Sequence, residues 1–203
     1  MIVHKSFKHG WFYHYRIHIP KAEELCNNKF YSLKKYLLDV KEYCPDDYFY
    51  KGPRGSALRI NTDLDVKRVK NHEVSKLASL GLESKKFNTA HSNVQMFMLQ
   101  NDTKTISIEV PIWLLSTELS GYNDIFETDE PLTGHIDVLR IEDEKIWIWD
   151  YKPNAFKEKY ASIQTNFYAI MLSKRTGIPL EYFRCGYFDD IDAFIFKPKL
   201  LAK

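Results

Sequence analysis

The segment from residue 134 to residue 151 constrains the fold more than any other part of the chain. It holds two runs with strand-like alternation, GHIDVLRI (134–141) and KIWIWDY (145–151), on either side of a short polar turn. Apolar, β-branched and aromatic residues in alternation around a short turn are typical of a β-hairpin. The segment therefore predicts two neighbouring antiparallel strands.

Further elements before and after this hairpin alternate between helical and strand-like spacing. They are a helix at 88–99, a strand at 104–115, a loop at 116–133, a helix at 155–175, and strands at 181–188 and 192–197. The order from residue 88 is α-β-β-β-α-β-β. This order predicts an α/β fold with a central mixed β-sheet flanked by helices.

The N-terminal part of the chain predicts fewer regular elements. They are helices at 31–43, ended by Cys44-Pro45, and at 72–82, with a basic, loop-like stretch at 51–68. Proline ends the first helix because it lacks the backbone donor and restricts the preceding residue. We expect residues 1–87 to form a helical and irregular segment that packs on a core formed by residues 88–203, within one compact domain.

Histidines and cysteines are unevenly placed. Four of the seven histidines lie within the first 18 residues. A metal site is one interpretation of this clustering, and a solvated or strand-alternating aromatic arm is the preferred one. The three cysteines, Cys26, Cys44 and Cys185, are widely spaced and form no CxxC motif. They predict neither a zinc ribbon nor a disulfide framework.

The composition argues against a membrane protein. The chain is 44% hydrophobic and 28% charged, and no apolar run approaches the roughly 20 residues that a membrane helix needs. The polar, aromatic N-terminus lacks the apolar core of a signal peptide. We therefore expect an intracellular, cytoplasmic protein with no membrane partner. The net charge of +2 does not by itself indicate a nucleic-acid partner.

The register of the 134–151 hairpin decides which polar side chains meet. If Ile141 pairs with Ile146, Asp137 lies opposite Asp150 on one face of the sheet. A two- or four-residue turn gives this register, and a three-residue turn would break it. Alternation along the strand then places Lys152 on the same face as Asp150.

Two carboxylates side by side at the end of an apolar strand repel each other, and desolvation adds to the cost. A cation between them would offset this repulsion, and carboxylate oxygens with open water positions suit Mg²⁺ or Mn²⁺. Lys152 would then neutralise charge on a transferred phosphoryl group or hold an attacking hydroxide. The simpler alternative is an ordinary salt bridge between Asp137 and Lys152, and an isolated D-x-K favours it.

The helix after this hairpin adds a polar row. Gln164 and Tyr168 are four residues apart and share one helical face, and Tyr160 lies one turn before them. Such a row can reach both the metal site and a phosphate backbone. For Tyr168, simple packing of the helix edge on the sheet remains an equal alternative.

Taken together, these residues resemble the RecB-like branch of the PD-(D/E)XK nuclease superfamily. This branch includes CRISPR-associated exonucleases and small stand-alone relatives in archaea and their viruses. The resemblance covers residues 88–197 well and residues 30–50 loosely, and it implies a restriction-endonuclease-like core. The matching motifs are GxxD at Gly134-His135-Ile136-Asp137, (D/E)xK at Asp150-Tyr151-Lys152, and QxxxY at Gln164 to Tyr168.

The resemblance also implies roles for individual residues. Metal ligands would be His91, Asp137, Asp150 and the Tyr151 backbone carbonyl. Lys152 would be the catalytic lysine, and Gln164, Tyr168 and Tyr160 would orient the site and touch DNA. His72 is the weaker rival for the histidine role. Glu109, in a segment similar to the family's Glu-Val-Pro strand, either binds metal through water or is an outward strand residue.

One feature of the family is missing. Many of these nucleases hold an iron–sulfur cluster with four cysteines, one in an N-terminal Cys-Pro element and three near the C-terminus. Here Cys44 stands alone in that role, and three cysteines cannot supply four thiolates. We therefore expect Mg²⁺ or Mn²⁺ as cofactor and no iron–sulfur cluster. Cys185 is expected to be a packed strand residue.

The resemblance implies a metal-dependent deoxyribonuclease that hydrolyses phosphodiester bonds, with DNA as its partner. Stacking on aromatic side chains would favour single-stranded DNA. One alternative is a non-catalytic nucleic-acid-binding or packaging protein on the same fold. Another is a junction-resolvase-type endonuclease, and because such enzymes act as dimers, a homodimer is left open.

Overall fold

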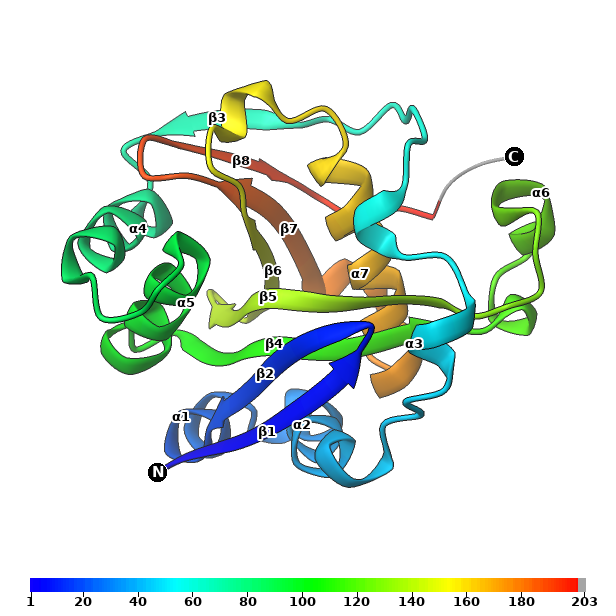
Figure 1. Cartoon of the computed structure of the whole chain (residues 1–203), viewed down its shortest axis with the longest axis horizontal. Helices are drawn as coiled ribbons and strands as arrows, with labels where there is room; N and C mark the ends of the chain where they lie inside the picture. The colour runs from blue at the N-terminus through cyan, green and yellow to red at the C-terminus, as the bar shows by residue number, and fades with distance from the viewer. Residues whose placement is uncertain (201–203) are drawn as a thin grey trace.

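A mixed β-sheet forms the centre of the computed structural model, which describes residues 1–200 (Figure 1). Its eight strands follow the order β1-β2-β4-β5-β6-β7-β8-β3. β6 and β7 run parallel, and the other neighbouring pairs are antiparallel. The strands are β1 Ile2–His9, β2 Trp11–His18, β3 Lys67–Lys70, β4 Thr105–Leu114, β5 Leu132–Glu142, β6 Lys145–Tyr151, β7 Phe183–Phe188 and β8 Asp192–Phe196.

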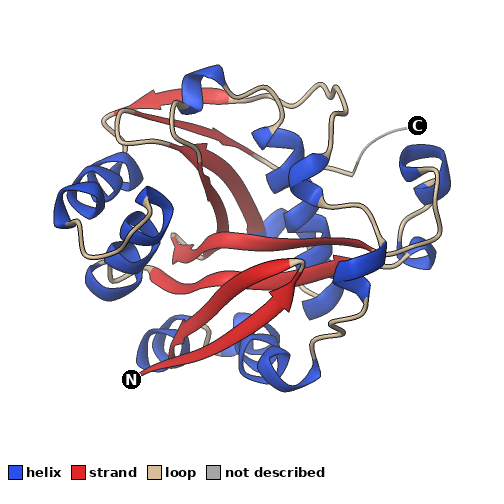
Figure 2. Cartoon of the chain, in the orientation of Figure 1, coloured by secondary structure: helices blue, strands red, loops and turns tan. Residues whose placement is uncertain are grey.

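Helices cover both faces of this sheet (Figure 2). α7 packs across β4 to β7, and α1 and α2 lie on the same side, whereas α5 packs on β4 and α4 on β8 from the other side. The sheet and its two helical layers confirm the expected α/β class with a mixed sheet. The helices are α1 Ile19–Leu25, α2 Tyr31–Tyr43, α3 Tyr48–Lys51, α4 Glu73–Ser84, α5 Ala90–Asn101, α6 Tyr122–Phe126 and α7 Ala161–Thr176.

The 134–151 hairpin has the register that the sequence predicts. Ile141 pairs with Ile146, and the pairing continues to Val138 opposite Trp149. The turn contains two residues, Asp143 and Glu144, with φ values of 48° and 55°. Two left-handed residues are what a type I′ hairpin turn requires, and this turn matches the twist of the flanking strands.

The N-terminal part of the chain differs from its sequence-based description as helical and irregular. β1 and β2 form a hairpin on one edge of the sheet, and β3 pairs with β8 on the other edge. β3 has the sequence KRVK, with a single apolar residue, so no alternation revealed it. A bidentate ion pair from Arg68 to Asp192, at 2.9 and 2.6 Å, holds β3 to β8.

Two other boundaries also differ from the sequence-based expectation. The expected loop at 116–133 contains α6 and a 3₁₀ turn, Ser116–Glu118. The helix expected from residue 155 begins at Ala161, after a separate 3₁₀ turn. Asn154 adopts a left-handed conformation with φ 66°, and Phe156, near the start of the expected helix, is 65% exposed. Phe156 fits the helical spacing of apolar residues by coincidence, so the sequence placed the start of the helix six residues too early.

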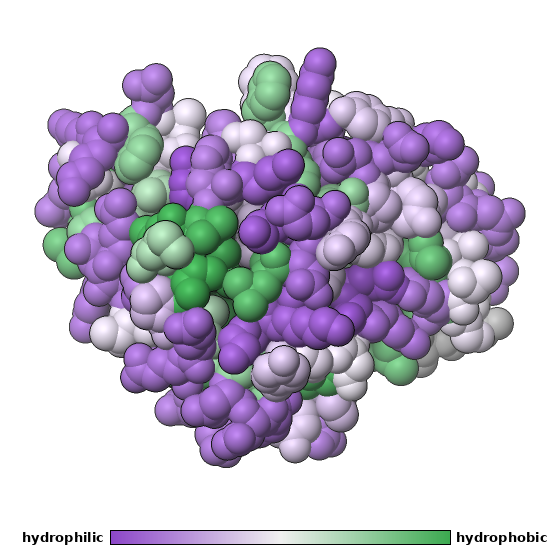
Figure 3. Space-filling model, turned by 90° about the horizontal axis from the view of Figure 1, so that it is seen from below, coloured by the Kyte–Doolittle hydropathy of each residue, from purple (hydrophilic) through white to green (hydrophobic). Residues whose placement is uncertain are grey.

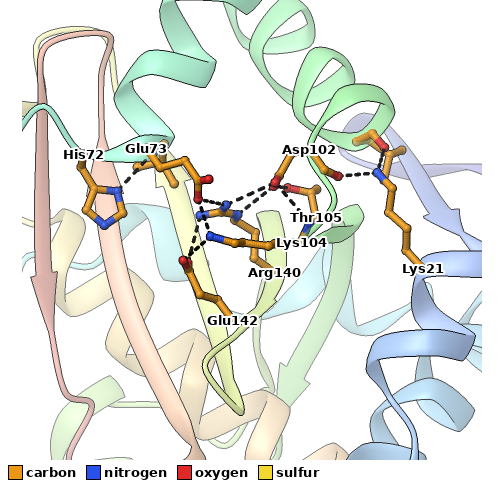
Figure 4. A network of polar contacts seen from close by, with 10 residues as sticks. Lys21, His72, Glu73, Asp102, Lys104, Thr105, Arg140 and Glu142 are labelled. Atoms are coloured by element: carbon orange, nitrogen blue, oxygen red, sulfur yellow. Dashed lines mark hydrogen bonds and ion pairs between the residues drawn. The ribbon is translucent and has the colours of Figure 1, made fainter.

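A buried ionic network fastens α4 and α5 to β5 (Figure 4). The fully buried Arg140 guanidinium on β5 contacts Asp102 at the end of α5 at 2.8 Å, Glu73 on α4 at 2.6 Å and Glu142 at 3.3 Å. Lys104 bridges the two glutamates at 2.8 and 2.5 Å. Burial of a guanidinium is tolerated only when it is paired in this way. The network fixes the helix and the strand that carry the site described below.

The face of the molecule seen in Figure 3 is mostly hydrophilic, with one larger hydrophobic area and several smaller ones. Within residues 1–200, no helix is both long enough and apolar enough to cross a lipid bilayer.

Candidate active site

Four ionisable side chains from three elements converge beside the middle of β5. Asp137 projects from β5 and Asp150 from the end of β6, with Lys152 directly after it, while His91 comes from the first turn of α5. His91 Nε2 lies 2.8 Å from Asp137 Oδ2, and Lys152 Nζ lies 2.8 Å from Asp150 Oδ2. The hairpin register therefore brings together the three residues that the sequence placed on one face, and α5 adds the predicted histidine.

Glu109 joins this cluster from β4. One donor atom each from Glu109, His91 and Asp137 lie within 4.8 Å of one another. Glu109 Oε1 accepts a hydrogen bond of 2.6 Å from Gln95 Nε2. Glu109 itself has φ 52° inside a strand, and a non-glycine residue in the left-handed region is strained. Of the two interpretations of Glu109, the structure favours the one in which its carboxylate belongs to the cluster.

The three carboxylates of the cluster outnumber its two cationic partners, His91 and Lys152. Burial and the Asp137 carboxylate raise the pKa of Asp150 and of Glu109 to about 7 each. Burial opposes protonation of His91, but the Asp137 carboxylate outweighs it and raises the pKa of His91 to about 9. Burial also opposes charge on Asp137, but His91 and Lys152 hold its pKa below the ordinary value. Like charges in a low-dielectric site favour binding of a cation.

One oxygen of Asp150 indicates where such a cation would bind. Asp150 Oδ1 accepts a hydrogen bond of 2.8 Å from Gln164 Nε2. Asp150 Oδ2 is buried, and among the described residues its partner is the Lys152 ammonium, at 2.8 Å, with no further hydrogen-bond donor. A buried carboxylate oxygen without a hydrogen bond is costly. Together with a carboxylate-rich, imidazole-containing donor set, it fits a divalent metal ion.

Gln164 and Tyr168 of α7 support the cluster from the side of Asp150. Gln164 Nε2 also lies 3.3 Å from the Tyr168 hydroxyl, so the two side chains share a face of α7 as the sequence predicts. The Tyr168 ring is 2% exposed. A Cβ atom built on Gly134 would lie 2.3 Å from its Cε1 atom, and one built on Gly55 would lie 2.4 Å from it. The first glycine of the GxxD motif is therefore required by the close approach of Tyr168.

The cluster opens into a cleft of about 670 Å³. One wall is the β1–β2 hairpin with Trp11, Phe12 and Tyr13, and the other is the start of α5. Trp11 is 77% exposed and Phe12 61% exposed. Arg16 and Arg54 also line the cleft. A basic and aromatic lining above an acidic cluster suits a polyanionic ligand with planar bases.

Some residues named from the sequence lie elsewhere. His72 caps α4, where its Nδ1 accepts a hydrogen bond from the Val74 N–H, and its ring lies 5.2 Å from that of Trp149. Tyr160 precedes α7 and stacks under Arg59, and it does not line the cleft. The Tyr151 N–H donates to Asp137 Oδ2 at 3.0 Å. The role of the Tyr151 carbonyl as a ligand stays a prediction.

Sequence reasoning missed several residues of the cleft. Gln95 is four residues after His91 and therefore on the same face of α5, so helical spacing would have identified it. Arg54 and Arg16 reach the cleft, and Gly55 reaches the Tyr168 ring beside it, only through the tertiary fold. No local signal in the sequence would have indicated them.

The mixed sheet with helices on both faces and an Asp-Asp-Lys cluster beside its central strands is the arrangement of a restriction-endonuclease-like fold. A family model described as the PD-(D/E)XK nuclease superfamily matches residues 62–201. The chain therefore belongs to the PD-(D/E)XK nuclease superfamily. No curated protein and no solved structure matches the chain. The match includes the whole acidic cluster, and the β1–β2 hairpin lies outside it.

Proposed function

We propose that this protein is a divalent-metal-dependent deoxyribonuclease of the RecB-like branch, with its active site at Asp137, Asp150 and Lys152. Membership of a nuclease superfamily indicates a hydrolase that acts on nucleic acid with divalent metal ions. The observation that carries the proposal is the buried Asp150 Oδ2 atom, which has no hydrogen-bond donor beside its ion pair with Lys152 and belongs to a cluster of carboxylates with raised pKa values.

The residues that would hold Mg²⁺ or Mn²⁺ are Asp137, Asp150, Glu109 and His91, with the Tyr151 carbonyl as a further ligand. When bound, the ion would lower the pKa of a water molecule and neutralise charge on the scissile phosphate. For His91 to act as a ligand, its Nε2 must turn from Asp137 and lose its proton.

The protein's own side chains would act as follows. Lys152 carries its ammonium at the cluster, where it can stabilise charge that develops on a phosphoryl oxygen. Gln164 holds Asp150 by Oδ1, so that Oδ2 faces Lys152 and the rest of the cluster. Arg16 and Arg54 would bind phosphates, and the exposed Trp11 and Phe12 rings would stack on bases, which favours single-stranded DNA.

The RecB-like branch is supported by the way its three motifs meet. Gln164 contacts Asp150, and the Tyr168 ring packs against Gly134. The GxxD, (D/E)xK and QxxxY motifs thus form one connected unit. The stand-alone archaeal or viral form, the intracellular location and a homodimer remain expectations from the sequence.

The test is incubation of the purified protein with end-labelled single- and double-stranded DNA in Mg²⁺ or Mn²⁺. We expect cleavage by the wild type, a loss of about 100- to 1,000-fold in rate for Lys152→Ala, and no measurable cleavage for Asp150→Asn. Asp190→Asn, on the exposed β7–β8 turn, is the matched control and should cleave normally. Absence of cleavage by the wild type under all metal conditions would favour the non-catalytic binding role. Cleavage that survives Asp150→Asn would exclude this site.

A further inference from the structure

A second group of potential metal ligands shares no residue with the acidic cluster. His9 Nε2, Cys44 Sγ and Asp46 Oδ1 all lie within 4.8 Å of one another. His9 is the last residue of β1, Cys44 is the residue that ends α2, and Asp46 follows two residues later. The tip of the β1–β2 hairpin reaches α3 at this point (Figure 1). Three segments of the N-terminal region therefore meet around one imidazole.

The geometry is that of chelation and not of a catalytic relay. Asp46 Oδ1 lies 2.9 Å from His9 Nε2, and Cys44 Sγ lies 4.0 Å from the same nitrogen. In a Cys-His-Asp relay the thiol and the carboxylate use opposite ring nitrogens. Here both face Nε2, so the carboxylate cannot orient the ring for proton transfer from the thiol. Three donors that converge on one point are the arrangement that a cation requires.

The His9 ring is fixed in the orientation that a ligand needs. It is fully buried and stacks on Phe49 with a centroid separation of 3.7 Å. Its Nδ1 atom lies 2.9 Å from Nε2 of His135, which is also buried. A metal-bound histidine usually donates its other N–H to a neighbouring acceptor. His135 Nε2 is in place to accept that hydrogen bond.

The backbone places the other two donors on one side. The Asp46 N–H donates to the Cys44 carbonyl at 3.0 Å, which folds the Cys44-Pro45-Asp46 segment into a tight turn. The Asp46 side chain is 61% exposed, so it can move by a few tenths of an ångström at little cost. One side of the group is buried and the other faces solvent, which leaves room for a water molecule as a fourth ligand.

We propose that His9, Cys44 and Asp46 form a second, structural metal site that binds Zn²⁺. A thiolate, an imidazole and a carboxylate are the donors that zinc prefers, whereas Mg²⁺ and Mn²⁺ favour oxygen. Tetrahedral zinc would hold sulfur and nitrogen roughly 3.5 Å apart, which is a small contraction from the observed separation. Binding releases the Cys44 thiol proton to water, and the neutral His9 ring keeps its single proton on Nδ1, where it faces His135 Nε2. The bound ion, one thiolate and one carboxylate then sum to zero charge.

The site would fix the hairpin that forms one wall of the cleft. The Arg54 guanidinium already donates to the His9 carbonyl and to the Tyr13 hydroxyl, and Tyr13 stacks on His135 at 3.6 Å. A metal bond from His9 to Cys44 and Asp46 would tie this wall to the end of α2. Metal at this site would therefore stabilise the hairpin independently of metal at the acidic cluster.

The test uses Co²⁺ as a spectroscopic probe of the full-length, metal-free protein. A cobalt–thiolate bond gives a charge-transfer band in the near ultraviolet, and the acidic cluster contains no cysteine. We expect this band to saturate at one equivalent of Co²⁺, to disappear when Zn²⁺ is added, and to be absent in Cys44→Ala. Asp46→Asn, on an exposed side chain, should keep the fold and weaken Co²⁺ binding by about tenfold or more.

Two control variants distinguish this site from another cysteine and from the acidic cluster as the source of the band. Cys26→Ala removes a different buried cysteine, and Asp150→Asn alters the acidic cluster, and both should keep the band. A wild-type protein that gives no band with excess Co²⁺ overturns the proposal. So does a band that persists in Cys44→Ala or is unchanged in Asp46→Asn. Because the readout is a spectrum, its failure is independent of whether the protein cleaves DNA.

Discussion

The contact between Gly134 and Tyr168 offers a sharp test of how the site is held. A methyl group on Gly134 would place its carbon 2.3 Å from Tyr168 Cε1 and 2.7 Å from both Cζ and the hydroxyl oxygen. The ring has little room to withdraw, because Gly55 approaches the same Cε1 atom and the side chain is buried. The Gly134→Ala substitution must therefore displace Tyr168.

The magnitude follows from packing and hydrogen bonding. Overpacking a well-packed interior costs about 1–3 kcal/mol, and loss of the hydrogen bond between Tyr168 and Gln164 would add roughly 1 kcal/mol. Gln164 also binds Asp150, so a shifted Tyr168 moves the carboxylate. A displacement of about 1 Å in a catalytic group can lower the rate by about 100-fold.

The assay is urea denaturation combined with single-turnover DNA cleavage, on wild type, Gly134→Ala, Tyr168→Leu and the double variant. Leucine removes the ring atoms that would collide with the new methyl group. Gly134→Ala should lower the free energy of unfolding in both backgrounds. We expect this loss to be smaller in the Tyr168→Leu background than in the wild type, by at least about 1 kcal/mol. Additive free energies of unfolding, or a Gly134→Ala protein with wild-type stability and rate, would refute the reasoning.

Three further outcomes are expected. Arg140→Ala removes the guanidinium that pairs with the buried Asp102 carboxylate, so urea denaturation should show a loss of about 3–5 kcal/mol, whereas Arg140→Met should lose less. Burial opposes ionisation of Glu73, but Lys104 and Arg140 hold its pKa below the ordinary value. The Glu73 carboxylate therefore contributes to stability above the pKa that it has in the unfolded chain, and this contribution is lost as the pH falls through its pKa in the folded protein. Glu73→Gln should then make the free energy of unfolding less dependent on pH at acidic pH. Mg²⁺ or Mn²⁺ should raise the melting temperature of the wild type but not of Asp150→Asn, and an equal rise in both would place the ion elsewhere.

The sequence predicted the parts of the site that depend on local periodicity. The pairing of Ile141 with Ile146 follows from strand alternation and a two-residue turn, and it is confirmed. The same alternation predicted that Asp137 and Asp150 would meet. Helical spacing predicted that Gln164 and Tyr168 share a face. Each of these relations spans few residues, so a repeating pattern is enough to indicate it.

Other parts of the site depend on contacts between distant segments. Gly55 approaches Tyr168 across 113 positions of sequence. Arg16 enters the cleft on a hairpin whose place beside β4 no sequence pattern indicated. The left-handed conformation of Glu109 is also invisible in sequence, because glutamate in a strand is normally extended. Tertiary contacts must impose that conformation, so only the folded chain reveals it.

The contacts at the two ends of α5 bear on the proposed role of His91 as a metal ligand. At its N-terminal end, α5 is attached to β5 through His91 and Asp137 at 2.8 Å. At its C-terminal end, Asp102 is held by Arg140 of the same strand, also at 2.8 Å, and Lys21 caps the last carbonyls of the helix. If His91 binds metal as proposed, that binding would replace the first contact, because the imidazole would have to leave the carboxylate. The second contact would then keep α5 on the sheet, so the helix would stay in place while the ligands exchange at its other end.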